Sequence, residues 1–193
     1  MARPREFDPD TVLERAMTVF WAKGYETTSL DDLCEATQLN RSSLYATFGD
    51  KHSLFLKTID RYGDGAVVRI STALSRPVPI REAVAGFVSD IVDRIVSGPG
   101  QVGCYIGNCV AEVARHDRAA AESLRRHLDR VEATFRSGFA QAKKRGELSA
   151  DTDIDALARF IVSSIQGLRL IGKTTNDRRA LEDIVRVMVR CVQ

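Results

Sequence analysis

The sequence lacks any long apolar segment. No run among its 193 residues approaches the roughly 18 to 20 apolar residues that a helix needs to cross a bilayer. The opening stretch, MARPREFDPD, carries two arginines with no apolar segment behind them, unlike a secretory signal. We therefore expect a cytoplasmic protein with no membrane partner.

Cysteine is sparse, and the charge is nearly balanced. In a reducing cytoplasm we expect free thiols, most of them buried, at the four cysteines Cys34, Cys104, Cys109 and Cys191. The formal net charge is +2, and the first 52 residues hold six basic and nine acidic residues. Bulk charge therefore does not indicate a nucleic-acid-binding protein. A phosphate-binding surface in this segment must depend on where a few groups lie.

Motifs of the common enzyme classes are also missing. The sequence contains no G-x-S-x-G, P-loop, G-x-G-x-x-G or H-E-x-x-H pattern. Cys104 with His116 or His127 has the residue types of a thiol–imidazole pair. However, His116 lies twelve residues along the same predicted helix, about three turns away. We expect a protein that is not an enzyme and has no cofactor.

Strand patterns are nearly absent. No segment sustains an alternation of period 2, and no Asn-Gly or Asp-Gly pair separates two β-branched runs. We find no repeat of 20–50 residues and no low-complexity tract. With 44% apolar residues, the chain can form one large domain or a small domain joined to a larger one. The sequence predicts an all-α fold.

Capping signals predict short helices in the first quarter of the chain. Asp8 can cap a first helix that has Pro9 at its first position, and Gly24 can end it. Ser29, with Asp32 three residues later, predicts a second helix that begins with a capping-box-like pattern.

A third helix and a fourth follow after short breaks. Asn40 can cap the third, and Gly49-Asp50 can end it and cap the fourth, which begins at Lys51. The inward-facing residues predicted for the four helices are Leu13, Ala16, Met17, Phe20, Leu30, Leu33, Cys34, Leu44, Phe48, Leu54, Phe55, Ile59 and Tyr62. Three short helices around one core, with a tight turn before the third, have the plan of a helix-turn-helix unit.

The third predicted helix lies within NRSSLYATFGDK, residues 40–51, and leaves polar side chains outward. Arg41 can reach a guanine edge or a phosphate, and Ser42 and Ser43 can bond either bases or phosphates. Tyr45 and Thr47 offer hydroxyls suited to phosphate oxygens. From the residues alone, the alternative is a polar face that is simply solvated.

Two helix starts also favour anions. Lys51 begins the fourth predicted helix, where exposed N–H groups and the helix dipole attract a negative charge. Thr28 and Ser29 stand at the start of the second. Both positions suit a phosphate of a nucleic-acid backbone.

The segment TTSLDDLCEATQLNRSSLYATFGDKHSLF, residues 27–55, resembles the DNA-binding segment of the tetracycline-repressor (TetR) family of bacterial regulators. The shared features are hydroxylated residues before the second helix, a Leu-Tyr pair in the third, Phe48 before a turn and the lysine that opens the fourth. AMTVFWAKGYETTS upstream also fits the family's first helix. One departure is Gln38-Leu39-Asn40, where the family usually has glycine, valine and serine.

The resemblance implies a helix-turn-helix domain over residues 1–52 and a ligand-binding and dimerisation domain over residues 53–193. It implies a homodimer that binds double-stranded DNA, with repression as the usual mode. Residues near bases would be Arg41, Ser42 and Ser43, and residues near phosphates would be Tyr45, Thr47 and Lys51. Two recognition helices about 34–36 Å apart predict a palindromic operator. Arg3 and Arg5 form either a minor-groove arm or a disordered end.

The remaining chain also reads as helices, broken at Pro77, Pro79 and SGPGQVG. The last two helices are apolar over more than one face, which indicates burial on more than one side. Their apolar residues are Leu157, Phe160, Ile161, Ile165, Leu168, Ile171, Leu181, Ile184, Val185, Met188 and Val189. They form either half of a four-helix dimer interface or the completion of the monomer's core.

Cys104 stands at the start of a predicted helix in the glycine-rich segment GPGQVGCYIGNCVAEVA, where backbone N–H groups favour a thiolate. Asn108 and Glu112 share its face, and Cys104 is either a packing residue or a sensor. The pattern resembles the Gly-Cys helix start of TetR-type repressors that sense electrophiles and oxidants. That resemblance pairs Cys104 with Lys173.

A small-molecule inducer is the other possibility for this half of the chain, because ligand pockets often lie between bundle helices. Its candidate lining residues are Phe87, Tyr105, Asn108, Glu112, Gln166 and Arg169. Two rival classes stay open. One is a metal-responsive regulator that uses Cys104, Cys109 and His116, although the five-residue cysteine spacing is unlike zinc sites. The other is a non-catalytic helical protein-interaction module.

Overall fold

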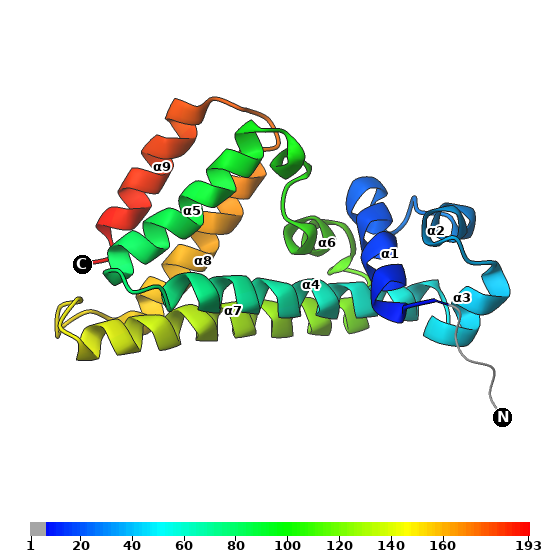
Figure 1. Ribbon diagram of the computed structural model, residues 1–193, viewed down its shortest axis with the longest axis horizontal. Helices are drawn as coiled ribbons and strands as arrows, with labels where there is room; N and C mark the ends of the chain where they lie inside the picture. Colours follow the sequence, from blue (N-terminus) through cyan, green and yellow to red (C-terminus); the bar gives the residue numbers. More distant parts are fainter. Residues whose placement is uncertain (1–6) are drawn as a thin grey trace. The chain divides into compact units, whose positions relative to one another are not determined.

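A computed structural model describes residues 7–193, and within that range the chain is helical with no strand. The predicted all-α class is therefore confirmed, whereas Arg3 and Arg5 lie outside the described residues. The α-helices are α1 (Pro9–Lys23), α2 (Leu30–Thr37), α3 (Arg41–Phe48), α4 (Lys51–Leu74), α5 (Ile80–Val96), α6 (Tyr105–Val113), α7 (Arg118–Lys144), α8 (Ile154–Ile171) and α9 (Arg178–Arg190) (Figure 1). No described helix is long and apolar enough to span a membrane.

The predicted start signals of α1 and α2 are confirmed. The Asp8 carboxylate accepts hydrogen bonds from the backbone N–H groups of Asp10 and Thr11 at 3.2 and 3.1 Å. Ser29 and Asp32 form a reciprocal capping box. The N–H of Asp32 donates to Oγ of Ser29 at 3.1 Å, and the N–H of Ser29 donates to Oδ2 of Asp32 at 2.9 Å. Both helices therefore begin where the capping residues predicted.

The next two helices are capped as the sequence indicated. The Asn40 side chain accepts a hydrogen bond from the N–H of Ser43 at 2.8 Å, and Asp50 accepts one from Ser53 at 2.6 Å. Gly49 ends α3 with φ of 92°, a conformation that glycine adopts without strain.

The core of the N-terminal helices differs from the prediction at α1. Val12, Ala16 and Phe20 are buried, whereas Leu13 and Met17 are only half-buried. The inward face of α1 is therefore centred nearer Val12 than the pattern of large apolar residues suggested. The other predicted residues that are buried are Leu33, Leu44, Phe48, Leu54, Phe55, Ile59 and Tyr62.

Gln38 supplies the left-handed residue of the turn between α2 and α3, with φ of 60° and ψ of 29°. This is the position where the family usually has glycine. Its side-chain Nε2 donates to the carbonyl oxygen of Glu35 at 2.6 Å. The N–H of Leu39 donates to the carbonyl oxygen of Cys34 at 3.2 Å. The turn thus keeps its geometry without glycine, at a conformational cost of about 1 kcal/mol.

The described residues form two compact units. The first comprises the chain up to Gly63 together with Asn108–His127, and the second comprises Asp64–Gly107 with Leu128–Gln193. Helices α4, α6 and α7 contribute residues to both units. The domain boundary expected after residue 52 stays a prediction, and α4 continues through that position without a break.

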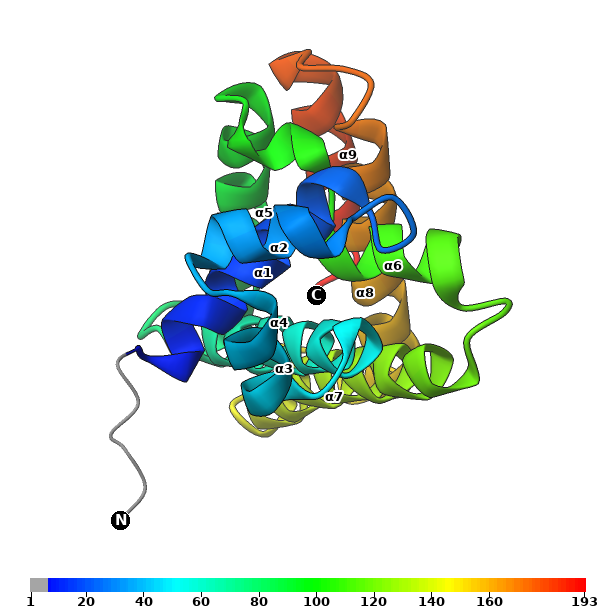
Figure 2. The ribbon, with the colours of Figure 1, turned by 90° about the vertical axis from the view of Figure 1, so that its right-hand side faces the viewer.

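In the second unit α9 lies against α5 and α8 (Figure 1, Figure 2). Helix α5 lies between the predicted breaks at Pro79 and SGPGQVG, and its first N–H, on Ile80, donates to a Glu147 carboxylate oxygen at 2.6 Å. The glycine-rich break before α6 holds a 3-10 turn, η1 (Pro99–Val102), which the sequence did not predict. These helices bury apolar residues on the faces that meet, which gives the second unit its own core.

Candidate DNA-binding interface

Helix α3 is anchored by its apolar residues and presents the polar ones. Leu44 and Phe48 are buried, whereas Arg41, Ser42 and Tyr45 are exposed. Arg41 lies three and seven positions before Leu44 and Phe48, on their side of the helix, and it is exposed as the first residue of α3. Ser42 points to the opposite side. The arrangement leaves the N-terminal end of α3 open to a ligand.

Tyr45 and Thr47 differ in how freely their hydroxyls are presented. Tyr45 is 43% exposed. Thr47 is half-buried, and its Oγ1 donates to the carbonyl oxygen of Ser43 at 2.9 Å. The Thr47 hydroxyl can therefore still accept a hydrogen bond, but its proton is already engaged within α3.

Arg41 is ion-paired across the turn. One of its terminal nitrogens, Nη2, lies 2.6 Å from Oδ1 of Asp31, which stands in the first turn of α2. Both side chains are exposed, Arg41 by 62% and Asp31 by 77%. The hydrogen bond that Arg41 donates to Asp31 raises the pKa of Arg41, so the guanidinium keeps its charge. The sequence pattern indicated Arg41 but not its partner Asp31.

Lys51 lies over an aromatic ring. Its Nζ is 4.5 Å from the centroid of Tyr25, within the range of a cation–π interaction. Partial burial, followed by the negative charges of Asp117, Glu26 and Asp50, raises the pKa of Tyr25. The ammonium group of Lys51 is thus held at the start of α4, where the sequence predicted an anion-binding group.

The two residues predicted at the start of α2 have different environments. Ser29 is exposed and caps the helix. Thr28 is only 1% exposed, and its hydroxyl donates to the carbonyl oxygen of Gly24. Thr28 is therefore packed inside the turn in this conformation, and it is not part of the interface proposed below.

Glu112 of α6, which we expected to line an inducer site, instead holds the turn between α1 and α2. Its Oε2 accepts a hydrogen bond from the N–H of Tyr25 at 3.1 Å, and its Oε1 accepts one from Glu26 at 2.9 Å. Gly24 has φ of 86°, and a Cβ there would lie 2.8 Å from Oε1 of Glu112. No local signal could reveal this contact, because the partners are 86 and 87 positions apart.

A second contact in the same unit joins α4 to the segment before α7. His52 Nε2 lies 2.7 Å from Oδ2 of Asp117, and the other oxygen of Asp117 accepts the N–H of Ala120 at 2.9 Å. Burial alone would raise the pKa of Asp117, but the hydrogen bonds from Ala120 and His52 lower it overall. Asp117 therefore stays ionised beside His52.

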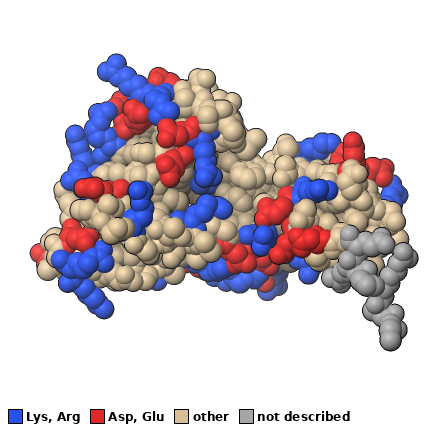
Figure 3. All heavy atoms as spheres, viewed as in Figure 1, with Lys and Arg blue, Asp and Glu red and all other residues tan. Residues whose placement is uncertain are grey.

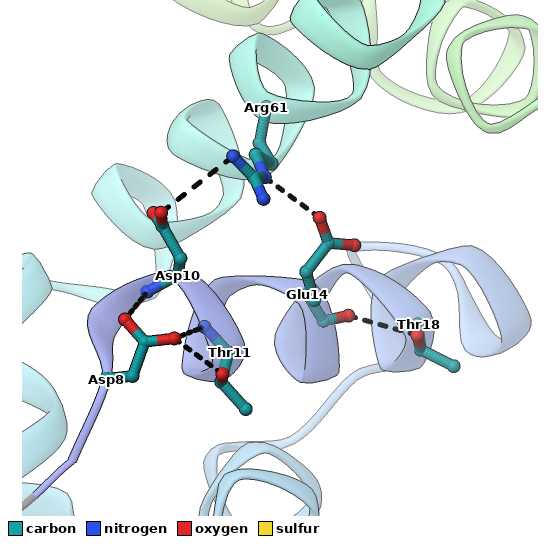
Figure 4. A network of polar contacts seen from close by, with 6 residues as sticks. All are labelled: Asp8, Asp10, Thr11, Glu14, Thr18 and Arg61. Atoms are coloured by element: carbon teal, nitrogen blue, oxygen red, sulfur yellow. Dashed lines mark hydrogen bonds and ion pairs between the residues drawn. The ribbon is translucent and has the colours of Figure 1, made fainter.

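An ion pair fixes α1 against α4 (Figure 4). Arg61 Nε lies 2.8 Å from Glu14 Oε1, and its Nη1 lies 4.0 Å from Asp10 Oδ2. On the face drawn in Figure 3, acidic and basic side chains are interspersed rather than gathered by sign.

Some of the residues expected to sense an inducer lie in the second unit. Cys104 and Tyr105 are buried, with exposed fractions of 5% and 0%. The Phe87 ring is half-buried, with its centroid 6.1 Å from that of Phe135. The thiol is therefore screened from solvent, and a reagent must open this region to reach it.

Gln166 of α8 lies beside the start of α6. A Cβ on Gly107 would be 3.1 Å from Oε1 of Gln166 and 3.4 Å from Cβ of Cys104. This amide oxygen is buried and has no hydrogen-bond partner among residues 7–193. The remaining expected residues are Asn108 and Arg169, which are half-buried, and Lys173, which is exposed. Their roles stay predictions.

The metal-site alternative finds no support in the described part of the chain. No group of three or more His, Cys, Asp and Glu side chains there is placed to hold a metal ion. His116 is exposed, and its Nε2 lies 2.9 Å from the carbonyl oxygen of Glu112. Among the described residues, Cys104, Cys109 and His116 therefore do not form the ligand set that we considered.

Two family models match most of the chain. A model of bacterial regulatory proteins of the tetR family matches residues 12–58. A model of the tetracyclin repressor-like C-terminal domain matches residues 81–188. The first match contains α2 and α3, and the second spans α6 to α8.

Known regulators resemble the whole chain. The uncharacterized HTH-type transcriptional regulator YezE of Bacillus subtilis (strain 168) is 38% identical over 188 residues, which is 97% of each chain. The HTH-type transcriptional repressor ComR of Escherichia coli (strain K12) is 32% identical over 172 residues, 89% of this chain and 82% of ComR.

A solved structure extends the likeness to three dimensions. A cysteine mutant of the TetR family regulator CifR, complexed with 26-base-pair operator DNA, is 33% identical. It has a TM-score of 0.86 over 97% of this chain and 98% of that chain. These relatives are transcriptional regulators rather than enzymes. Together with the exposed third helix, the matches show that this chain belongs to the TetR family and is a DNA-binding transcriptional regulator.

Proposed function

We propose that this regulator is a cytoplasmic repressor. It binds a palindromic operator as a homodimer and leaves the operator when an inducer acts on the second unit. The observation that carries the proposal is the exposed N-terminal end of α3, with Arg41 and Ser42 presented and Leu44 buried behind them. The repressor ComR and the operator complex of CifR support it by likeness.

Each proposed contact residue has a role that its chemistry supports. A recognition helix contacts bases with its N-terminal residues and phosphates with flanking groups. The base contacts come from Arg41, Ser42 and Ser43. The phosphate contacts come from Ser29, Tyr45, Thr47 and Lys51. Arg41 is the strongest candidate for reading a base, because a guanidinium can donate two hydrogen bonds to one guanine.

Helices α8 and α9 form the dimer interface in this proposal. Both keep large apolar side chains at the surface, beyond those that complete the core of the second unit. The exposed ones are Phe160, Leu170, Ile171 and Val187. Apolar groups gathered on neighbouring helices favour association with an identical face, which a twofold axis brings together.

Cys104 is the site at which an electrophilic inducer acts. Its sulfur adds to the electrophilic carbon of an α,β-unsaturated carbonyl, and the thiol proton moves to the adjacent carbon, so no leaving group is needed. The adduct adds volume to a buried position beside Gly107 and Gln166, and close packing there forces α6 or α8 to move. A non-covalent apolar ligand between the helices of the second unit is the alternative inducer.

Footprinting tests the proposed function. Wild-type protein is first used to enrich duplexes from a random-sequence pool, and the enriched duplex is then probed for protection. We expect two protected half-sites related by a twofold axis, with centres one helical turn or a multiple of it apart. Protection of a single unsymmetrical half-site contradicts the dimeric mode, and no enrichment contradicts sequence-selective binding.

A further inference from the structure

We propose that Asp31 determines the base specificity of DNA binding. From α2 it holds the guanidinium of Arg41 in position to read a guanine edge, and it weakens attachment of Arg41 to phosphates. This inference rests on the proposed function, in which Arg41 contacts bases. Nothing in the sequence pattern singles out Asp31, and the assignment comes from its contact with Arg41.

The geometry leaves most of the guanidinium free. Asp31 Oδ1 contacts a single nitrogen of Arg41, Nη2, at 2.6 Å. Arginine has five N–H donors in a planar fork, so an edge of the group can still donate to O6 and N7 of guanine. The Asp31 carboxylate can therefore orient the Arg41 guanidinium and still leave N–H donors free to bond a base.

Both ends of the pair are fixed by the backbone. Asp31 is in the first turn of α2, beside the capping box of Ser29 and Asp32. Arg41 is the first residue of α3, directly after the Asn40 cap. Because two capped helices carry the two groups, the ion pair restricts the long Arg41 side chain to one region before DNA arrives.

The pair has little to do with folding. Its side chains are 62% and 77% exposed, and ion pairs that are so exposed add little to stability. A role in orientation fits better, because a long side chain loses less conformational freedom on binding when it is already held.

Charge explains the effect on phosphates. The pair as a whole carries no net charge, so the general field of the DNA backbone attracts it far less than it would attract Arg41 alone. A guanine edge still offers two matched acceptors in one plane. The Asp31 carboxylate thus lowers sequence-independent attraction while it keeps the base contact.

The test compares base discrimination in matched variants. The probes are the duplex enriched by wild-type protein, its single-base-pair substitutions, and a scrambled duplex of equal length. The variants are Asp31→Asn, Arg41→Ala, Arg41→Lys and Glu35→Gln. Glu35→Gln is the matched control, because it also removes one exposed carboxylate from α2. Thermal unfolding is measured for each variant to show that the fold is kept.

Arg41→Ala first identifies the base pair that Arg41 reads, as the position where discrimination disappears. In wild-type protein, substitution of that base pair is expected to weaken binding by about tenfold or more. In Asp31→Asn we expect this penalty to shrink by about threefold, and binding to the scrambled duplex to rise by about twofold. Arg41→Lys, which lacks the planar fork, should discriminate less at that position than wild type does.

Two results overturn the inference. One is an unchanged penalty in Asp31→Asn at the position that Arg41 reads. The other is an equal change in Glu35→Gln, which would make the effect one of bulk charge. If the proposed function itself is wrong, wild-type protein enriches no duplex at all. That result is distinct from the two above, which both require an enriched duplex.

Discussion

The Oε2 atom of Glu112 lies 3.1 Å from the backbone nitrogen of Tyr25, 87 positions earlier in the chain. The contact joins α6 to the turn that precedes the two helices of the helix-turn-helix unit. Since the same carboxylate also accepts the N–H of Glu26, the turn is held at two points. The Glu112 carboxylate therefore helps to fix the turn before α2.

Replacement of Glu112 by alanine is expected to destabilise the first unit. The N–H of Tyr25 is partly buried and loses a charged acceptor, so the free energy of unfolding should fall by about 1–3 kcal/mol. Urea unfolding measures the change. Glu122→Ala is the control, because Glu122 makes an exposed ion pair with Arg118 on α7 at 3.2 Å. Its loss should cost about 0.5 kcal/mol or less. Equal effects in the two variants would contradict the role of Glu112.

Acid should remove a contribution that Asp32 makes to stability. A hydrogen bond from Lys23, followed by one from the N–H of Ser29, lowers the pKa of Asp32 from 3.8 to about 2. Because the folded value lies below the unfolded one, this contribution is complete above about pH 4 and is lost as the pH falls toward 2. The difference in unfolding free energy between wild type and Asp32→Asn should therefore be constant from about pH 7 to 5 and narrow below about pH 4. A difference that stays constant down to acid pH would show that ionisation of Asp32 is not involved.

A charge on α9 should separate the dimer. Val187 is 60% exposed, so Val187→Glu leaves the monomer's core intact while it places a carboxylate in the proposed interface. Sedimentation equilibrium should show a dimer for wild type and a dissociation constant raised by about tenfold or more in the variant. Val68→Glu is the matched control, because Val68 is 62% exposed on α4. A dimer that tolerates Val187→Glu would place the interface elsewhere.

Release from DNA by a thiol reagent should depend on Cys104. We expect N-ethylmaleimide to release wild-type protein from the enriched duplex, and the Cys104→Ser protein to stay bound. Cys191→Ser is the control, because Cys191 is exposed at the end of α9 and its loss should leave release unchanged. Mass spectrometry checks which cysteine carries the adduct. Equal release of Cys104→Ser and wild type would exclude Cys104 as the sensor.

The local parts of this structure could be predicted from the sequence. Capping depends on residues three positions apart, so Ser29 with Asp32 and Asn40 with Ser43 marked the helix starts correctly. The inward face of α1 was predicted less well, because packing of the whole unit selects Val12 over Leu13.

Long-range contacts could not be predicted in the same way. Arg41 was identified from its chemistry, but its partner Asp31 depends on how α2 meets α3. Glu112 was assigned to a ligand surface because it shares a helix face with Cys104. Its actual partners are backbone amides, which carry no sequence signal. A hydrogen bond between a side chain and a distant backbone amide thus cannot be predicted from the sequence pattern.

The central claim is that α3 and the start of α4 hold operator DNA by a few placed contacts. A salt titration tests this claim most directly. Binding of the enriched duplex is measured at several salt concentrations for wild type, Lys51→Met and Tyr45→Phe. Each ionic phosphate contact contributes about 0.9 to the slope of log K against log salt. Lys51→Met should flatten the slope by about 0.9 per subunit, whereas Tyr45→Phe should lower affinity without changing it. Unchanged affinity and slope in both variants would contradict the account.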